Sequence, residues 1–283
     1  MLLYNPLPPW RKYGARTGSF MHRDHRKILI ADDIGFTGGH NLSSAYLSDD
    51  PSYHDTSVRV EGSQASELAA VFAQGIALAQ GIADYPLHLK VHLNGAQAQD
   101  MRRGLSGPEE ALSMIIREAT NRCYLTLAYF VPPEWLVEAM IRSARRGVDV
   151  RLLTAGKTDV PIAREAGRHI YETLLDGGVR IFEYQPKRLH AKTVVADARI
   201  SLIGSFDFNT LSRRHSLEVT VTSDDTQLAG ELERTFHSNV VHSREIVPDE
   251  WHSRGGFERA VETLCHRLFT RIALSHGPHL DAP

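Results

Sequence analysis

The feature that most constrains how this chain can fold is a motif of the form His-x-Lys-x4-Asp that occurs twice. One copy covers residues 25–32 and the other covers residues 190–197. Each copy is followed by a glycine-containing turn, at residues 38–41 and 204–207. Self-similarity of this kind indicates that the chain contains two related structural units.

The match between the two copies extends beyond the motif. Similar short segments precede it, at residues 3–6 and 183–186. An acidic residue that opens an alternating strand pattern follows it, Asp55 in the first copy and Glu218 in the second. The repeat therefore includes equivalent acidic groups as well as equivalent His and Lys.

Each copy of the motif predicts a β-hairpin. Asp32 and Asp197 stand in turn signals between short apolar or β-branched runs. The predicted strands are residues 27–31 with 34–37, and 192–196 with 200–203. Because residues i and i+2 of a strand face the same way, we expect the His and Lys of each copy to point into one space.

The rest of the chain alternates helices and strands, which is typical of an α/β fold. Helices are expected at residues 109–119, 132–146, 162–175 and 226–239, and strands at 123–131, 148–154 and 179–184. Residues 84–108 have the composition of a connection, so we expect two domains, 1–95 and 96–283. Only 24 residues precede the first motif, so we expect the first domain to lack its opening strands and helices.

Composition narrows the function classes. A formal net charge of −2 excludes the strongly basic surface of a general nucleic-acid binder. The chain has only 2 Cys, so neither a disulfide framework nor a cysteine zinc site is expected, and a reducing cytoplasmic setting is the simpler interpretation. It has no run of apolar residues long enough to predict a transmembrane helix.

Two His and two Lys that converge indicate phosphoryl transfer on a phosphodiester. A neutral imidazole can attack phosphorus and form a phosphohistidine, and a second, protonated imidazole can supply a proton to the leaving alcohol. Two Lys and nearby backbone N–H groups can hold the non-bridging oxygens, so no metal or cofactor is expected. A carboxylate behind each imidazole would fix its tautomer, and Asp55 and Glu218 are placed to do so.

The pair of motifs resembles the phospholipase D superfamily, and its surroundings resemble the bacterial cardiolipin synthase branch. The segments that carry the second likeness are residues 36–41, 129–132, 145–150 and 184–192. The resemblance implies two α/β/α lobes with mixed sheets, the first lobe incomplete, and one active site at the seam. It also implies transfer of a phosphatidyl group between phospholipids, typically two phosphatidylglycerols that give cardiolipin and glycerol.

The resemblance also implies a role for each motif residue. His25 would be the nucleophile and His190 the general acid and base, an order that the residues alone leave open. Phosphate would be bound by Lys27, Lys192, Asn41 and Ser205, with Asp207 beside them, and the hairpins would be braced by Asp32 and Asp197. Asp207 departs from the family pattern, which has Asn there, and so places a carboxylate near a phosphate.

Weaker signals lie outside the motifs. The C-terminal segment has apolar residues at helical spacing with Arg around them: Phe257, Val261, Leu264, Leu268 and Ile272, with Arg254, Arg259, Arg267 and Arg271. This helix could rest on anionic lipid or pack on its own domain, and we expect the second. Arg213 and Arg214 could contact a lipid phosphate or lie on the surface. We expect solvated or core positions, not metal ligation, for His88, His92, His237 and His252.

The expected function is a phosphatidyltransferase that acts on phospholipids, phosphatidylglycerol first, at the cytoplasmic side of the inner membrane. One alternative is a phosphodiesterase that passes the group to water, on lipid or nucleic acid. Balanced charge and few Lys speak against nucleic acid. Another alternative is a non-catalytic remnant at a membrane surface, because a shortened first domain leaves activity open.

Overall fold

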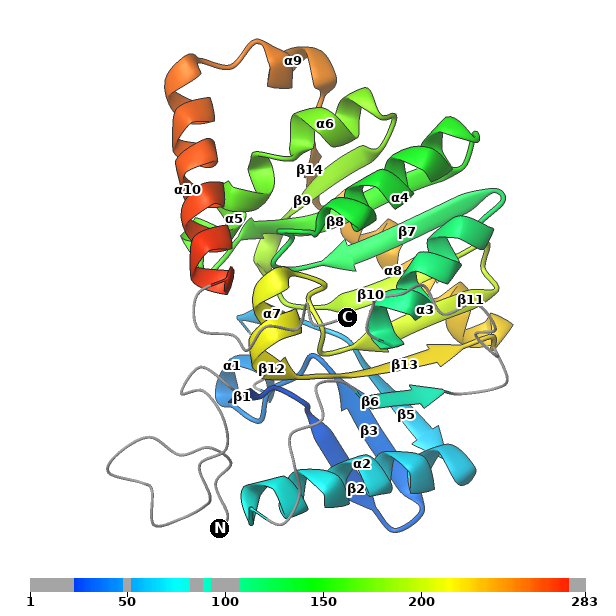
Figure 1. The fold of residues 1–283 in the computed structure, drawn as a ribbon. Helices are drawn as coiled ribbons and strands as arrows, with labels where there is room; N and C mark the ends of the chain where they lie inside the picture. The colour runs from blue at the N-terminus through cyan, green and yellow to red at the C-terminus, as the bar shows by residue number, and fades with distance from the viewer. Residues whose placement is uncertain (1–22, 48–51, 82–88, 93–106, 275–283) are drawn as a thin grey trace, which may run out of the picture.

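The computed structural model describes residues 23–47, 52–81, 89–92 and 107–274 (Figure 1). These residues form an α/β fold with mixed sheets, as the sequence predicts. Within the described ranges the strands form a nine-stranded sheet, a three-stranded sheet and a two-stranded pair. Residues 3–6, His88 and the expected domain boundary at residue 95 lie outside the described ranges.

The nine-stranded sheet is built mainly by the second half of the chain. Its strands are β4 (Tyr53–His54), β6 (Leu89–His92), β7 (Arg122–Leu127), β8 (Asp149–Lys157), β9 (Arg180–Leu189), β10 (Lys192–Ala196), β11 (Ile200–Gly204), β13 (Val219–Ser223) and β14 (Ser243–Glu245). Their order is β14-β9-β8-β7-β10-β11-β13-β6, with β4 beside β9. Helices connect β7, β8 and β9, so these strands are parallel, whereas the tight connection between β10 and β11 makes that pair antiparallel.

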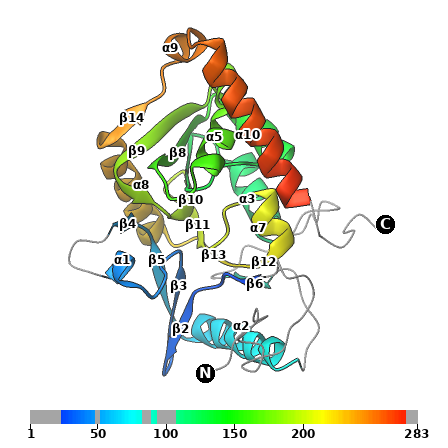
Figure 2. The same cartoon turned by 90° about the vertical axis from the view of Figure 1, so that its left-hand side faces the viewer.

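Helices cover both faces of this sheet (Figure 2). The helices of the second half are α3 (Gly107–Glu118), α4 (Glu134–Arg145), α5 (Pro161–Arg168), α6 (Tyr171–Asp176), α7 (Thr210–His215), α8 (Thr226–Val241), α9 (Pro248–His252) and α10 (Gly256–Leu274). Leu112 of α3, Leu136 of α4 and Leu174 of α6 share one buried cluster. On the other face, Phe236 of α8 stacks on Tyr124 at 4.7 Å between ring centroids. The second half is therefore a three-layer α/β/α lobe.

The described part of the first half is a smaller sheet with one long helix. Strands β2 (Ile28–Ala31), β3 (Ile34–Gly38) and β5 (Ser57–Glu61) pair in that order, and α2 (Ser63–Ala79) packs on them. Val58, Val60 and Leu68 lie in the same buried cluster as Val195 and Val221 of the large sheet. The two halves therefore share a hydrophobic core. The sequence analysis did not predict α2, although this Ala-rich segment has apolar residues at helical spacing.

Both hairpins are confirmed, as β2–β3 and β10–β11. Asp32 and Asp197 both take φ 55° in their turns, a left-handed conformation that Asp tolerates better than most residues. The strands begin at Ile28 and Lys192, so His25 and His190 precede the strands and do not lie on them. The reason is that the backbone at each His pairs with a different segment, as described below.

One expected helix and one expected strand differ in length from the elements in the structure. The helix expected over residues 162–175 is two helices, α5 and α6. The side chains of α5 enter a small cluster around Phe269, whereas those of α6 enter the main core, so the helix axis must change between them. The strand expected over residues 123–131 ends at Leu127, because the backbone of Tyr129 bonds to Asp207 and Asn209 instead of to a strand.

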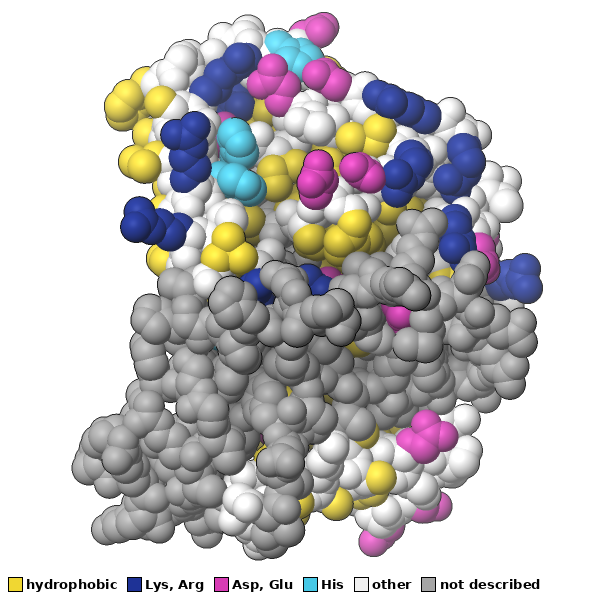
Figure 3. All heavy atoms as spheres, in the orientation of Figure 1, with side chains coloured by type: hydrophobic (Ala, Val, Ile, Leu, Met, Phe, Trp, Pro, Cys, Tyr) yellow, Lys and Arg dark blue, Asp and Glu magenta, His cyan; other side chains and the backbone are white. Residues whose placement is uncertain are grey.

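Helix α10 packs by the face opposite to its apolar stripe. Phe269 and Ala273 are buried, and the helix lies against α5 and α7. The stripe itself is exposed: Phe257, Val261, Leu264, Leu268 and Ile272. The expectation that this helix packs on its own domain is therefore confirmed, although the apolar residues of the stripe are not the ones that it buries. In Figure 3, hydrophobic and basic side chains alternate along the left edge, where α10 runs. None of the helices in the described ranges is long and apolar enough to cross a bilayer.

Candidate active site

The two motif His meet where the halves join. The ring centroids of His25 and His190 are 6.3 Å apart, with 72° between the ring planes. Two residues of β1 (Arg23–Asp24) pair in parallel with β12 (Ser216–Leu217), and β4 pairs in parallel with β9. The first pairing places the segment before His25 beside the segment before Glu218. The second places the segment before His190 beside the segment before Asp55.

The same backbone hydrogen bond occurs at both His. The amide of His25 donates to the carbonyl of Leu217 at 3.0 Å. The amide of His190 donates to the carbonyl of His54 at 2.8 Å. Leu217 directly precedes Glu218, and His54 directly precedes Asp55. The repeat in the sequence is therefore also a repeat in geometry.

Each imidazole is held by a carboxylate from the other half. His25 Nδ1 lies 3.1 Å from Glu218 Oε2, and His190 Nδ1 lies 2.8 Å from Asp55 Oδ2. Both carboxylates have fully buried side chains. Burial alone would raise the pKa of Asp55, but the hydrogen bond with His190 and the charge of Lys192 outweigh it and lower that pKa. With Nδ1 used in this way, Nε2 is the nitrogen that each ring can offer to a substrate.

The glycine turns let the carboxylates approach. A Cβ added at Gly39 would lie 2.1 Å from Asp55 Oδ1, so only glycine leaves room for this carboxylate. In the second copy, Ser205 Oγ donates to Glu218 and accepts from the amide of Val219 at 3.1 Å. Ser205 is fully buried, and its hydroxyl contacts the carboxylate that holds His25.

The two motif Lys fold back onto their own His. Lys27 Nζ donates to the carbonyl of His25, and Lys192 Nζ donates to that of His190, each at 2.6 Å. Burial lowers the pKa of Lys27 to about 8, although Glu218 partly opposes the shift. Lys192 is almost fully buried and lies 3.5 Å from Asp207. Asp207 therefore balances the charge of a buried ammonium beside the two imidazoles.

Among the residues that the structure describes, aromatic rings surround the imidazole of His190 and not that of His25. Tyr46, Tyr53 and Tyr129 lie edge-on to His190, with centroids 5.6, 6.0 and 5.7 Å from its ring. The His190 side chain is 5% exposed, whereas that of His25 is 33% exposed. The two motif copies are thus equivalent in backbone geometry but differ in access to solvent.

These aromatic residues were not predicted as site residues from the sequence. Tyr129 also donates its hydroxyl hydrogen to Asp159 at 2.6 Å and lies 5.6 Å from the Lys192 ammonium. Burial raises the pKa of Tyr129, and Asp159 adds to the shift, so the phenol stays protonated. Tyr129 stands in the expected strand 123–131 and in the segment 129–132 that resembles cardiolipin synthases, but no role was predicted for it. One sequence signal could have identified Tyr129. It is an aromatic residue that follows a strand lying beside the strand of the second motif.

The remaining motif residues lie around this centre. The Asn41 amide donates to the Tyr46 hydroxyl at 3.1 Å, which places it beside the aromatic wall. Asp197 accepts hydrogen bonds from the amides of Thr120, Asn121 and Arg122 at 2.8–2.9 Å, and so ties its hairpin to the start of β7. Asp32 occupies the equivalent turn of the first hairpin.

The Arg and His residues outside the two motifs make contacts away from the two imidazoles. Arg213, for which two roles stayed open, forms an ion pair with buried Glu109 at 3.1 Å. His252 pairs with Asp176, and His237 lies against Tyr124. In the described ranges, no group of three or more His, Cys, Asp and Glu is arranged to hold a metal ion.

Comparison with known proteins supports the resemblance to cardiolipin synthases. Residues 112–240 match a family model described as "Cardiolipin synthase, PLD-like domain". The chain is 33% identical to cardiolipin synthase A of Pseudomonas putida over 237 residues, which is 81% of this chain and 50% of that protein. It is 30% identical to cardiolipin synthase A of Proteus mirabilis over 259 residues, covering 86% of this chain and 53% of that protein.

A solved structure shares the fold. The crystal structure of phosphatidylserine synthase from Haemophilus influenzae matches 88% of this chain and 69% of that one, with a TM-score of 0.63 and 14% sequence identity. The chain spans about half the length of the curated relatives that it matches. Its repeated motif, its fold and these matches show that it is a cardiolipin synthase-like member of the phospholipase D superfamily.

Proposed function

We propose that this chain transfers a phosphatidyl group from one phospholipid to the hydroxyl of another. The observation that carries the proposal is the pair of imidazoles with ring centroids 6.3 Å apart, each held by a buried carboxylate. Two imidazoles held in this way can share the work of a double displacement at one phosphorus atom.

The reaction has two half-reactions. In the first, His25 Nε2 attacks phosphorus, the bond from phosphorus to the headgroup oxygen breaks, and His190 gives its Nε2 proton to the leaving alcohol. In the second, neutral His190 takes a proton from the hydroxyl of a second lipid, whose oxygen attacks phosphorus. The phosphorus–nitrogen bond then breaks and releases His25. Two phosphatidylglycerols would give one cardiolipin and one glycerol.

The proposal assigns His25 as the nucleophile because its side chain is the more exposed one. A nucleophile must approach phosphorus in line, whereas a proton donor has only to reach one oxygen. Phosphorylation of Nε2 leaves a positive ring, and the carboxylate of Glu218 stabilises that charge. Lys27 and Lys192 would balance the phosphate oxygens, and the burial of Lys192 strengthens its interaction with them.

The exposed stripe of α10 supports a lipid surface as the place of action. The five apolar residues defined above are 36–82% exposed, and Arg267 and Arg271 beside them are also exposed. An apolar stripe flanked by Arg suits the boundary between headgroups and acyl chains of an anionic membrane. We therefore propose peripheral association through α10.

The test is to incubate the purified chain with phosphatidylglycerol vesicles and to analyse the lipids. The proposal expects cardiolipin with an equal amount of glycerol. Phosphatidic acid in place of cardiolipin would indicate transfer to water, and no product from a chain with a folded far-UV spectrum would indicate a non-catalytic protein. Either result would contradict the proposal.

The covalent step has its own test. Acid quenching is avoided because a phosphohistidine is labile in acid, and the labelled protein is trapped at alkaline pH. His25→Ala should abolish the labelled adduct, whereas His190→Ala should slow its formation and leave the attachment site intact. A labelled adduct that survives His25→Ala would refute the assigned nucleophile.

A further inference from the structure

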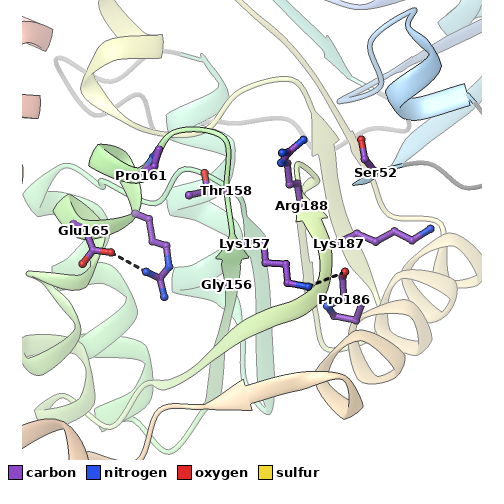
Figure 4. A pocket seen from close by; sticks show the side chains of 10 residues that line it. Ser52, Gly156, Lys157, Thr158, Pro161, Glu165, Pro186, Lys187 and Arg188 are labelled. Carbon is purple, nitrogen blue, oxygen red and sulfur yellow. Dashed lines mark hydrogen bonds and ion pairs between the residues drawn. The ribbon is translucent and has the colours of Figure 1, made fainter.

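A basic cavity lies beside the candidate active site. It has a volume of about 700 Å³ and lies between the loop after β8, the start of α5 and the end of β9 (Figure 4). Its lining carries four cationic side chains, Lys157, Arg164, Lys187 and Arg188, and one carboxylate, Glu165. The mechanism proposed above uses none of these groups.

The cavity keeps positive charge after its internal ion pairs are counted. Arg164 is paired with Glu165 at 2.7 Å and with Glu183 at 3.3 Å, so its charge is balanced. Lys157 Nζ lies 3.4 Å from the carbonyl of Pro186, a contact that leaves its charge uncompensated. Figure 4 shows Lys157 extending from β8 toward Pro186, with Arg188 close by. Lys157 and Arg188 therefore give this side of the cavity a net positive potential.

The cavity is connected to His190 through one strand. The amides of Arg188 and His190 donate to the carbonyls of Ser52 and His54, so the backbone stays extended past the end of β9. Two residues apart in extended backbone, the Arg188 and His190 side chains leave the same side of the chain, ~7 Å apart. The register of β4 and β9 places Tyr53 opposite Arg188, and the guanidinium lies 5.5 Å from the Tyr53 ring centroid. The Tyr53 ring also lies edge-on to His190, at 6.0 Å between centroids.

We propose that this cavity binds the phosphodiester of the acceptor phospholipid, so that the acceptor is an anionic lipid. This inference rests on the proposed transfer reaction and adds a second anion subsite to it. A glycerol headgroup separates its phosphate from its terminal hydroxyl by a three-carbon chain, which suits the spacing from Arg188 to His190. Lys157 and Arg188 hold the acceptor phosphate, and the hydroxyl extends past Tyr53 to His190.

Two acids near the cavity restrict where a phosphate can bind. Glu165 is paired with Arg164, as described above, so its charge is balanced. Asp159 keeps its negative charge, because its hydrogen bond with Tyr129 outweighs the effect of burial and lowers its pKa, and it therefore favours the neutral hydroxyl over the phosphate on the Tyr53 side. A charged hydrogen bond from an ammonium or guanidinium to a phosphate contributes about 1.5–3 kcal/mol. Loss of one such contact therefore corresponds to roughly a tenfold or greater loss in acceptor affinity.

The test separates the two half-reactions. The chain is first loaded with labelled phosphatidyl groups from a donor, and the adduct is measured. Samples of the labelled chain are then mixed with one of two acceptors, short-chain phosphatidylglycerol or ethanol, and ethanol carries no phosphate. Lys157→Gln should lower kcat/KM for phosphatidylglycerol at least tenfold and leave adduct formation and phosphatidylethanol yield within about twofold. Arg145→Gln, the same charge change on exposed α4, is the matched control and should alter neither product.

The possible outcomes distinguish failure of the proposed function from failure of the acceptor subsite. If the unaltered chain forms no adduct, the proposed function fails at the first step, and this inference fails with it. If the adduct forms but Lys157→Gln lowers both products equally, or neither, the acceptor subsite is refuted while the transfer reaction stands. If Lys157→Gln removes binding of inorganic phosphate and leaves transfer to phosphatidylglycerol unchanged, the cavity serves free phosphate and the inference is likewise overturned.

Discussion

The crossed carboxylates make a prediction that distinguishes the two imidazoles. Asp55→Asn keeps the shape of the group 2.8 Å from His190 Nδ1 and removes its charge. A carboxylate and an imidazolium whose charge centres are about 4 Å apart attract by roughly 4 kcal/mol at an effective dielectric constant of 20. Loss of this attraction should slow a step that needs protonated His190 by up to ~10³-fold.

The leaving group determines whether that loss is observed. An alcohol headgroup needs a proton as it departs, whereas p-nitrophenolate leaves without one. With a phosphatidylglycerol donor, Asp55→Asn should therefore slow adduct formation by up to ~10³-fold. With a p-nitrophenyl phosphodiester donor, the same variant should slow it less than about tenfold.

Glu218→Gln is the matched variant at the other imidazole. In the proposed mechanism, Glu218 orients His25 and stabilises the positive ring that attack on phosphorus creates, whichever group leaves. Its loss should slow adduct formation by a similar factor with both donors. The measurement is single-turnover release of nitrophenol or glycerol, with far-UV spectra as a control for folding. If Asp55→Asn impairs both donors alike and Glu218→Gln only the alcohol donor, the roles of His25 and His190 are reversed.

Three further predictions concern the charged groups Lys27 and Asp197. Because burial lowers the pKa of Lys27 to about 8, kcat/KM should fall as pH rises through that value and the ammonium loses its proton; a rate unchanged up to pH 10 would contradict this role. Asp197→Ala should reduce the free energy of unfolding by about 1–3 kcal/mol, since three backbone amides lose a charged acceptor and the exposed ones bond to water instead. Asp32→Ala, at the same φ of 55°, is its control in urea denaturation, and a loss no larger than in this control would refute the brace. Hydrogen bonds to Asp197 lower its pKa from 3.8 despite burial, so its contribution should be present above pH 3.8 and lost as pH falls through the lowered value.

The residues of the centre were predictable because the motif repeats, but their pairing was not. Residue types and spacing identify His25, His190, Asp55 and Glu218, since the same four-group pattern is needed for the chemistry. Which carboxylate holds which imidazole depends on two parallel strand pairs of two residues each. Such short, long-range pairings leave no periodic signal in a sequence.

Tyr129 shows a second reason for a failed prediction. Its surroundings, from Cys123 onward, are apolar except for the β-branched Thr126, which favours a strand through Val131. The strand ends early because Asp207 and Asn209, about eighty residues later, bond to the Tyr129 backbone. A local pattern cannot contain that information, because the competing hydrogen bonds come from another part of the chain.

The crossed arrangement makes the proposed activity a joint property of both halves. If each half held its own imidazole, one half could keep an oriented nucleophile without the other. Here the second half supplies Glu218 to His25 and receives Asp55 for His190, so separating the halves removes both carboxylate–imidazole pairs at once. The buried cluster shared by Val58, Leu68 and Val221 opposes that separation. Mutations in this shared core should therefore change the orientation of the two imidazoles relative to each other. We expect such mutations to reduce activity even where every polar group of the centre is intact.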